Sequence, residues 1–185
     1  SVANGLVWGP DGWLYGAQGS TTSCRVTRPG IDATNAPGVY FEGCMVWRYH
    51  PDTRAFEIFA EGSGNTFGLD VDAQGRLYSG HNGGGTRGFH YVQGGFYQMQ
   101  GVDAGKFGPP RNPYAFGDLP MMHTTNNAVR FTHFGSVVEG TAMPPETAGL
   151  LLTLDPLHNV VLTSERLPRG ATFTTVDREP ALRSD

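Results

Sequence analysis

The sequence predicts an all-β fold, and three observations support this prediction. The 185 residues include 27 glycines and 13 prolines, so the chain turns often. Only 16% of the residues are charged while 11% are aromatic, which suits short packed strands better than a helical bundle or a disordered chain. A hairpin pattern near the start of the chain also returns further along it, as in proteins built from repeated β-units.

The first predicted element is a β-hairpin over residues 4–19, NGLVWGPDGWLYGAQG. Its turn contains Gly12, which can take the positive φ that a tight hairpin turn requires. The pattern returns over residues 65–80, NTFGLDVDAQGRLYSG, with Gly75 at the turn. Superposing the two segments pairs Leu6 with Leu69, Gly12 with Gly75 and Tyr15 with Tyr78.

A second hairpin follows the first. Residues 45–49 and 54–60 alternate as strands, and residues 50–53 (HPDT) place proline and aspartate where a tight turn accepts them. We therefore expect four antiparallel strands within residues 4–62, after which the pattern restarts at Asn65.

The rest of the chain is divided in the same way. The second unit contains a long Gly-rich insertion at residues 80–120, and a third unit starts near Ala128. Its strands are expected at residues 129–139, 149–154, 160–166 and 171–176. The approximate units are residues 1–63, 64–127 and 128–185, within one domain that spans residues 1–185.

Four-stranded antiparallel units in succession predict part of a β-propeller with roughly three blades. A β-sandwich is the alternative, because it also has many strands and frequent turns, but the restart of the same hairpin favours the propeller. Three blades do not close a ring, so we expect the chain to be part of a larger propeller.

Several segments carry a resemblance to a known family. They are residues 4–16, 46–98, 112–117 (NPYAFG), 130–133 (RFTH), 154–162 (LDPLHNVVL) and 172–177 (TFTTVD). In this order they resemble the membrane-bound dehydrogenase family of Planctomycetes and related bacteria, whose propeller is similar to the soluble quinoprotein glucose and sorbosone dehydrogenases. The match runs through nearly the whole chain.

The resemblance implies oxidation of a sugar or other alcohol, with pyrroloquinoline quinone as hydride acceptor and Ca²⁺ polarising it. It also implies a periplasmic, extracellular or membrane-associated location, and a cytochrome c electron acceptor elsewhere in the full-length protein. The two cysteines do not form a c-type haem motif in this chain.

Propeller topology brings certain loops to one face, around the central channel. Those loops span residues 16–24, 62–67, 80–87 and 120–127, and they carry Gln18, Asn65, His81, Asn82, Arg87, His123, Asn126 and Asn127. Ligands bind in such concave mouths. The hairpin tips with Asp11 and Asp72 fall on the opposite face, so these carboxylates are expected to be turn residues.

His81 is the candidate general base, because an unperturbed imidazole titrates near neutral pH and can take a hydroxyl proton. Arg87 is the second catalytic candidate, since it can stabilise negative charge on a quinone oxygen or anchor an acidic substrate. The neighbouring glycines would let the backbone approach a ligand closely. The alternative is a loop whose His81 and Arg87 only hold its own carbonyl groups.

Candidate cofactor-binding residues are Gln18, Asn65, Asn82 and His123, and no residues are assigned to a metal. Two of the other histidines, His90 and His133, alternate with aromatic residues and are expected to pack, while His50 and His158 sit in turns. The aromatic side chains Phe96, Tyr97, Tyr114 and Phe116 either stack on a sugar or pack the insertion onto the blades. A non-catalytic propeller that binds a glycan or protein partner is therefore the alternative function, and calcium-dependent hydrolysis at the channel is a third.

Several classes of protein are disfavoured. The net charge of −4 argues against a nucleic-acid partner. The sequence has no apolar run of 18 residues, which predicts no membrane span, and its opening residues do not resemble a signal peptide. Cys24 and Cys44 leave two alternatives open, a disulfide in an oxidising compartment or two free thiols.

Overall fold

The computed structural model describes residues 3–97, 110–127 and 133–184. Part of the predicted insertion (98–109) and the predicted start of the third unit (128–132) lie outside the described residues. Within them the regular elements are β-strands, apart from one 3₁₀ turn at Pro145–Thr147, and no α-helix occurs. The all-β prediction is confirmed.

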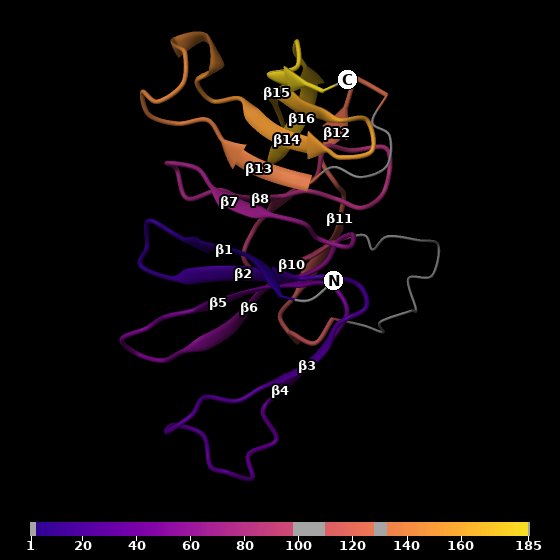
Figure 1. The fold of residues 1–185 in the computed structure, drawn as a ribbon. Helices are drawn as coiled ribbons and strands as arrows, with labels where there is room; N and C mark the ends of the chain where they lie inside the picture. Colours follow the sequence, from indigo (N-terminus) through magenta and orange to yellow (C-terminus); the bar gives the residue numbers. More distant parts are fainter. Residues whose placement is uncertain (1–2, 98–109, 128–132, 185) are drawn as a thin grey trace.

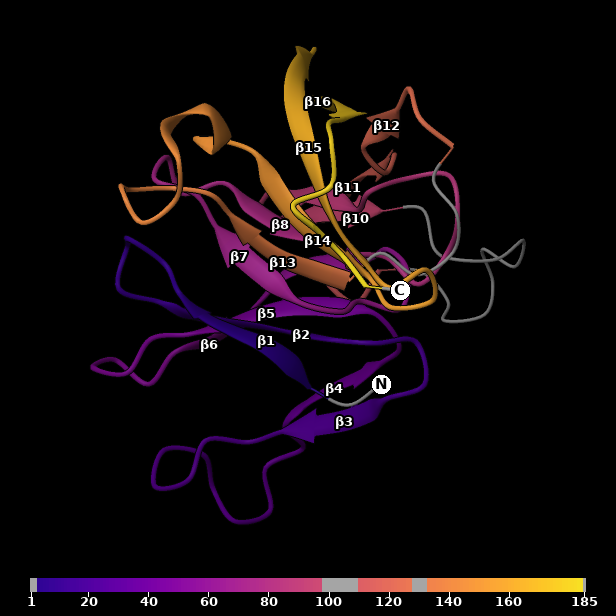
Figure 2. The same cartoon turned by 45° about the horizontal axis from the view of Figure 1, so that its top comes forward.

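The first sheet contains the first two predicted hairpins. Its strands β1 (Asn4–Trp8), β2 (Leu14–Gln18), β5 (Met45–Tyr49) and β6 (Phe56–Gly62) are antiparallel neighbours in this order. Two further strands, β10 (Gly95–Tyr97) and β11 (Phe116–Leu119), extend its edge beyond β6 in parallel. A separate ribbon of β3 (Ser23–Val26) and β4 (Val39–Glu42) projects away from this sheet (Figures 1 and 2).

The other two sheets follow in chain order. The second contains β7 (Leu69–Val71), β8 (Leu77–Ser79) and β9 (Phe89–Tyr91). The third contains β13 (His133–Val137), β14 (Leu151–Asp155), β15 (Val160–Arg169) and β16 (Thr172–Asp177), all antiparallel to their neighbours. Two short strands border it, β12 (His123–Thr124) beside β16 and β17 (Leu182–Arg183) beside β15.

The repeated hairpins have the same turn. The N–H of Gly12 donates to the Gly9 carbonyl at 3.1 Å, and the N–H of Gly75 donates to the Asp72 carbonyl at 2.8 Å. Both turn glycines have positive φ, +82° and +77°. The sequence alignment of the two hairpins is therefore confirmed down to the backbone hydrogen bonds.

The second unit differs from the expected four antiparallel strands. Only three of its strands pair with one another in the described residues, because the chain after β9 turns at Val92 and crosses to the first sheet. The crossing strand is held there by its tyrosine. Tyr97 is buried, and its hydroxyl donates to the His90 carbonyl at 2.7 Å and accepts the Val92 N–H at 2.9 Å.

The three sheets stack face to face with the second in the middle (Figures 1 and 2). Side chains of β8 alternate between the two neighbours. Leu77 belongs to an apolar cluster shared with the first sheet, which contains Tyr15, Ala17, Val46, Phe59, Leu69, Phe89 and Tyr91. Tyr78 belongs to a cluster shared with the third sheet, which contains Met122, Phe134, Val137 and Leu151. Both faces of the second sheet are therefore buried.

Two glycines allow the leading strands β1, β7 and β13 to lie side by side. Gly5 has a φ of +64°, and a Cβ there would lie 2.7 Å from Cβ of Leu69. The equivalent residue Gly68 has a φ of +74°, and its Cβ would lie 2.1 Å from the carbonyl oxygen of Phe134. The Gly-Leu pair that recurs in the sequence is thus the joint between consecutive sheets, since a larger residue would push them apart.

A buried ionic cluster joins the second and third sheets at the hairpin-tip end. Asp72 accepts hydrogen bonds from Arg76 Nε at 2.7 Å and from Arg166 Nη1 at 2.9 Å, and Arg166 also donates to the Tyr78 hydroxyl at 2.6 Å. Burial opposes ionisation of Asp72, but the Arg76 N–H and the two guanidinium groups outweigh it, so its pKa lies below the usual value. Burial also raises the pKa of Tyr78 to about 12. Asp72 is therefore more than the turn residue expected from sequence, because it binds an arginine 94 residues away.

Candidate functional site

The loops with most candidate residues lie at the end opposite the hairpin tips (Figure 1). The backbone N–H of Ser20 donates to Asn65 Oδ1 at 3.0 Å, which ties the loop after β2 to the loop after β6. Thr86 Oγ1 donates to the Met122 carbonyl at 2.6 Å and ties the loop after β8 to the segment before β12. These contacts bring together segments that are distant in sequence.

His81 occupies the centre of the loop after β8 and is only 2% exposed. Its ring lies between two glycines, since a Cβ on Gly64 would be 1.7 Å from Nδ1 and a Cβ on Gly83 would be 2.1 Å from Nε2. The edge of the ring also meets Phe89, with centroids 5.3 Å apart. The glycines expected to make room for a ligand thus include one, Gly83, that makes room for this imidazole.

The electrostatic state of His81 follows from its burial. Desolvation lowers its pKa to about 4, so the near-neutral titration expected from the sequence is wrong and the ring is neutral at pH 7. Its Nδ1 is buried and has no hydrogen-bond partner among the described residues. Buried polar atoms are nearly always paired, so an orphaned nitrogen in a loop marks a candidate functional group.

The backbone next to His81 is held by a cluster of small polar side chains that the sequence did not indicate. The Gly64 carbonyl accepts hydrogen bonds from Cys44 Sγ at 2.9 Å, Thr66 Oγ1 at 3.2 Å and Ser63 Oγ at 3.4 Å. Ser63 has a φ of +80°, which is unusual for a residue other than glycine. These bonds keep the segment in a strained conformation directly against the imidazole.

Arg87 is 4% exposed and already has an ionic partner. Its Nε and Nη2 donate to the two carboxylate oxygens of Asp177 at 3.1 and 2.5 Å. Asp177 also accepts from Ser164 Oγ at 2.8 Å, and its N–H donates to Asn126 Oδ1 at 2.7 Å. Arg87 therefore locks the second sheet to the third, and its remaining nitrogen, Nη1, is buried without a partner among the described residues.

The four predicted cofactor residues do not converge on one point. Gln18 is buried and donates to the Gly43 carbonyl at 2.9 Å, so it anchors the β3–β4 ribbon. Asn65 holds the Ser20 N–H, and Asn82 is half-buried next to His81. His123 lies exposed on β12, beside the third sheet.

These positions test whether the described residues fit the quinone and Ca²⁺ that the family resemblance implies. In the described ranges no three His, Cys, Asp or Glu side chains come close enough to hold a metal ion. The charge of Arg87 is neutralised by Asp177, and Gln18 is engaged with the backbone. In this part of the chain the predicted cofactor residues therefore do not form a single site for a quinone with its calcium ion.

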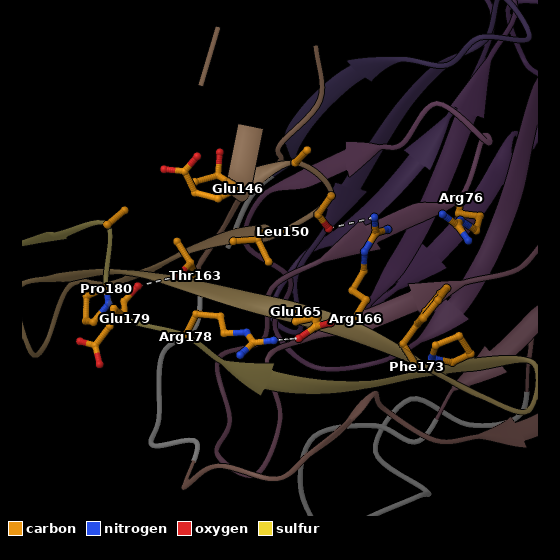
Figure 3. A pocket seen from close by; sticks show the side chains of 15 residues that line it. Arg76, Glu146, Leu150, Thr163, Glu165, Arg166, Phe173, Arg178, Glu179 and Pro180 are labelled. Atoms are coloured by element: carbon orange, nitrogen blue, oxygen red, sulfur yellow. Dashed lines mark hydrogen bonds and ion pairs between the residues drawn. The ribbon is translucent and has the colours of Figure 1, made fainter. Parts of the chain in front are cut away.

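Of two further grooves, one lies away from these loops and the other includes Gln18 and Cys24 of the predicted loop 16–24. A groove of about 900 Å³ runs along the third sheet (Figure 3). Its arginines are engaged, because Arg166 binds Asp72 and reaches the Gly149 carbonyl at 3.2 Å, and Arg178 pairs with Glu165. A second groove of about 340 Å³ lies on the first sheet and is lined mainly by apolar side chains.

The remaining candidates are placed as follows. Neither cysteine forms a disulfide bond, so of the two alternatives the structure has two thiols. Cys24 Sγ lies 3.1 Å from Gln18 Oε1, and burial raises the pKa of the Cys24 thiol. His90 packs against the Tyr78 ring at 5.2 Å, as expected. His133 stacks on Phe67 at 4.4 Å, His50 meets Trp13 edge to face at 5.1 Å, and His158 Nδ1 lies 2.9 Å from an Asp155 oxygen. Of the four aromatic candidates, Tyr97 is buried, Phe96 is half-buried, and Tyr114 and Phe116 are 88% and 50% exposed.

Comparison with known families assigns the chain. The model of the domain of unknown function DUF7133 matches residues 1–183. The chain belongs to the DUF7133 family. No curated protein and no solved structure matches this DUF7133 chain. Over the residues described here, no helix is long and apolar enough to cross a membrane.

Proposed function

We propose that the three stacked sheets of this DUF7133 chain are consecutive blades of a β-propeller. The support is the order of their leading strands, since β7 contacts β1 on one side and β13 on the other. The same glycine joint occurs between both pairs of sheets. In a propeller the leading strands surround a central channel, and the crossover loops gather at one mouth of it.

The proposed activity is that of a quinoprotein-like dehydrogenase acting on a sugar or other alcohol. The observation that supports it is the buried, neutral His81 with its unpartnered Nδ1 at the loop end. Oxidation of an alcohol removes one proton and one hydride. We assign the proton to His81. An acceptor of the quinone class would supply the site for the hydride, and it would have to be held outside the described residues, since the predicted cofactor residues do not form one site.

Proton transfer places a requirement on the loop after β6. Nδ1 of His81 lies against Gly64, so a substrate hydroxyl reaches it only when that loop moves away from the ring. Movement of this segment would release the strain in the Ser63 backbone, which lowers the free-energy cost of the movement.

The resemblance to the membrane-bound dehydrogenase family of Planctomycetes supports two further proposals. The proposed location is periplasmic or extracellular, and the proposed electron acceptor is a cytochrome c.

The test is an assay of the protein that carries this domain, with pyrroloquinoline quinone, Ca²⁺, an artificial electron acceptor and a panel of sugars. The change His81→Gln should lower the rate at least about 100-fold, as for loss of a general base. The matched control is His158→Gln, in a turn at the third sheet. Unchanged activity of His81→Gln would remove the catalytic role of this histidine.

A second candidate function is a non-catalytic propeller that binds a glycan or protein partner. It is favoured by one observation, the 88% exposure of Tyr114 in the segment that precedes β11, because an exposed aromatic ring offers a stacking surface. Binding on a glycan array that is lost in Tyr114→Ala, while His81→Gln binds normally, would support it. Equal binding by both variants, or none by the wild type, would contradict it.

A further inference from the structure

One face of the first sheet is apolar and exposed along β1, while Cys24 and Val26 of β3 flank the groove on this face. The side chains of Leu6 and Trp8 on β1 are 66% and 60% exposed. Beside them lies the groove of about 340 Å³. It is lined by Ala3, Leu14, Gln18, Cys24, Val26, Met45, Trp47, Tyr49 and Phe56. Contiguous apolar surface of this kind marks an interaction site.

The equivalent face of the second sheet is buried. Leu69 corresponds to Leu6 and is 6% exposed, and Leu77 corresponds to Leu14 and is 1% exposed. Both belong to the apolar cluster between the first and second sheets. The first sheet therefore presents the same surface that the second sheet buries against its neighbour.

The joint between sheets specifies what can cover this surface. Gly5 of the first sheet lets Leu69 of the second approach, and Gly68 of the second lets Phe134 of the third approach. By the same rule Leu6 needs a neighbour that carries glycine at the position of Gly5. We propose that the face of Leu6, Trp8 and Leu14 binds a further four-stranded unit of this same repeat, through the face that the first sheet presents to the second.

A second copy of this chain does not supply that unit. Among the three stacked sheets of the described residues, the third lies at the end of the stack, so its outer face is the one that another copy could offer (Figure 1). Its strands pair Phe134 with Thr153 and Val137 with Leu151, as the second sheet pairs Leu69 with Ser79 and Val71 with Leu77. Between these pairs β13 has one residue more than β7, because its register shifts between Phe134 and Ser136. The position of Gly68 therefore falls on His133 or Phe134, and neither side chain allows the close approach that glycine allows.

This inference depends on the repeat and not on catalysis by His81, so an inactive enzyme would leave it untouched. The test is a tandem chain in which an extra copy of residues 4–66 precedes residue 4. Leu6→Cys in the original first unit, with Cys24→Ser in both copies, reports coverage through its rate of reaction with a thiol reagent. We expect this rate to fall at least about tenfold relative to the chain without the extra unit.

The matched control is the same tandem chain with Gly5→Val in the added copy only, which should restore the fast reaction. A tandem chain whose Leu6→Cys reacts as fast as in the original chain overturns the proposal, and so does one whose added unit stays unfolded by circular dichroism. The unmodified chain should sediment as a monomer. Concentration-dependent association that Leu6→Glu abolishes would assign the face to a second copy and also overturn the proposal.

Discussion

The two repeated hairpins have the same turn but opposite surroundings. The hairpin of β1 and β2 has one face open, with Leu6 66% exposed, whereas the hairpin of β7 and β8 is covered on both faces, with Leu69 6% exposed. Their carboxylates differ too, since the side chain of Asp11 is 41% exposed and that of Asp72 is fully buried between two arginines. The same local sequence pattern therefore forms an outer layer in one place and a middle layer in the other. The neighbouring sheets determine how much equivalent residues contribute to the free energy of unfolding.

The largest expected effect concerns the joint. Gly68→Ala would place a Cβ 2.1 Å from the Phe134 carbonyl oxygen and should lower the free energy of unfolding by more than about 4 kcal/mol. Gly12→Ala is the matched change, because Gly12 also has positive φ but nothing within 4 Å of its Cβ. It should cost about 1–2 kcal/mol, the penalty of the left-handed backbone alone. Urea denaturation measures both, and equal losses would show that the joint contributes nothing.

The ionic cluster should come next. Asp72→Ala leaves Arg166 buried without its carboxylate and should cost about 3–5 kcal/mol. Asp11→Ala removes a partly exposed carboxylate that accepts the Tyr15 hydroxyl at 2.7 Å, and should cost about 1 kcal/mol. Similar losses in chemical denaturation would contradict the difference between the two turns. The lowered pKa of Asp72 means that its contribution is present at neutral pH and declines as pH falls below about 4.

The apolar pair tests coverage directly. Leu69→Ala should destabilise the protein by about 2–4 kcal/mol, because it empties space between two sheets. Leu6→Ala should change stability by less than about 0.5 kcal/mol, since the side chain is exposed in this chain. Thermal denaturation of the two variants side by side gives the difference. A large loss in Leu6→Ala would mean that the first sheet is covered in the chain alone.

The smallest expected effect is the pH dependence that a buried histidine of the middle layer contributes. Burial, reinforced by the positive charge of Arg76, lowers the pKa of His90 to about 4, against about 6.5 in the unfolded chain. The unfolded state therefore binds the proton first as pH falls, and stability declines from about pH 6.5 to about pH 4. His90→Phe keeps the aromatic packing and should remove about 2 kcal/mol of this decline at pH 5. An unchanged slope of stability between pH 7 and pH 5 would show that His90 is not protonated on unfolding.

Sequence reasoning succeeded where the signal is local. The alternation of β1, β2, β5 and β6 and the glycines at residues 12 and 75 are enough to predict the hairpins, because strand period and turn chemistry act over a few residues. The packing of His90 among aromatic rings was predicted on the same basis. These features would be expected in any context that buries one face of the hairpin.

It failed where partners are far apart in the chain. The crossing of β10 to the edge of β6 depends on which sheet edge is free, and a three-residue strand carries no signal for that choice. The pairing of Arg87 with Asp177 joins residues 90 positions apart, and the single sequence does not couple them. The enclosure of His81 by Gly64 and Gly83 could not be predicted from the sequence either, since a glycine-rich loop has the same sequence pattern whether it surrounds a ligand or one of its own side chains.

The alternation along β8 has an evolutionary consequence. Leu77 faces one neighbouring sheet and Tyr78 the other, so deleting a single residue from this strand would exchange the two and bring a phenol into the apolar layer and a leucine into the ionic one. Insertions and deletions in homologous chains should therefore avoid Leu77–Ser79 and accumulate in the β3–β4 ribbon, which projects away from the stack (Figure 1). Comparing how often insertions and deletions occur in these two segments across the family would show which parts of the molecule tolerate changes in length.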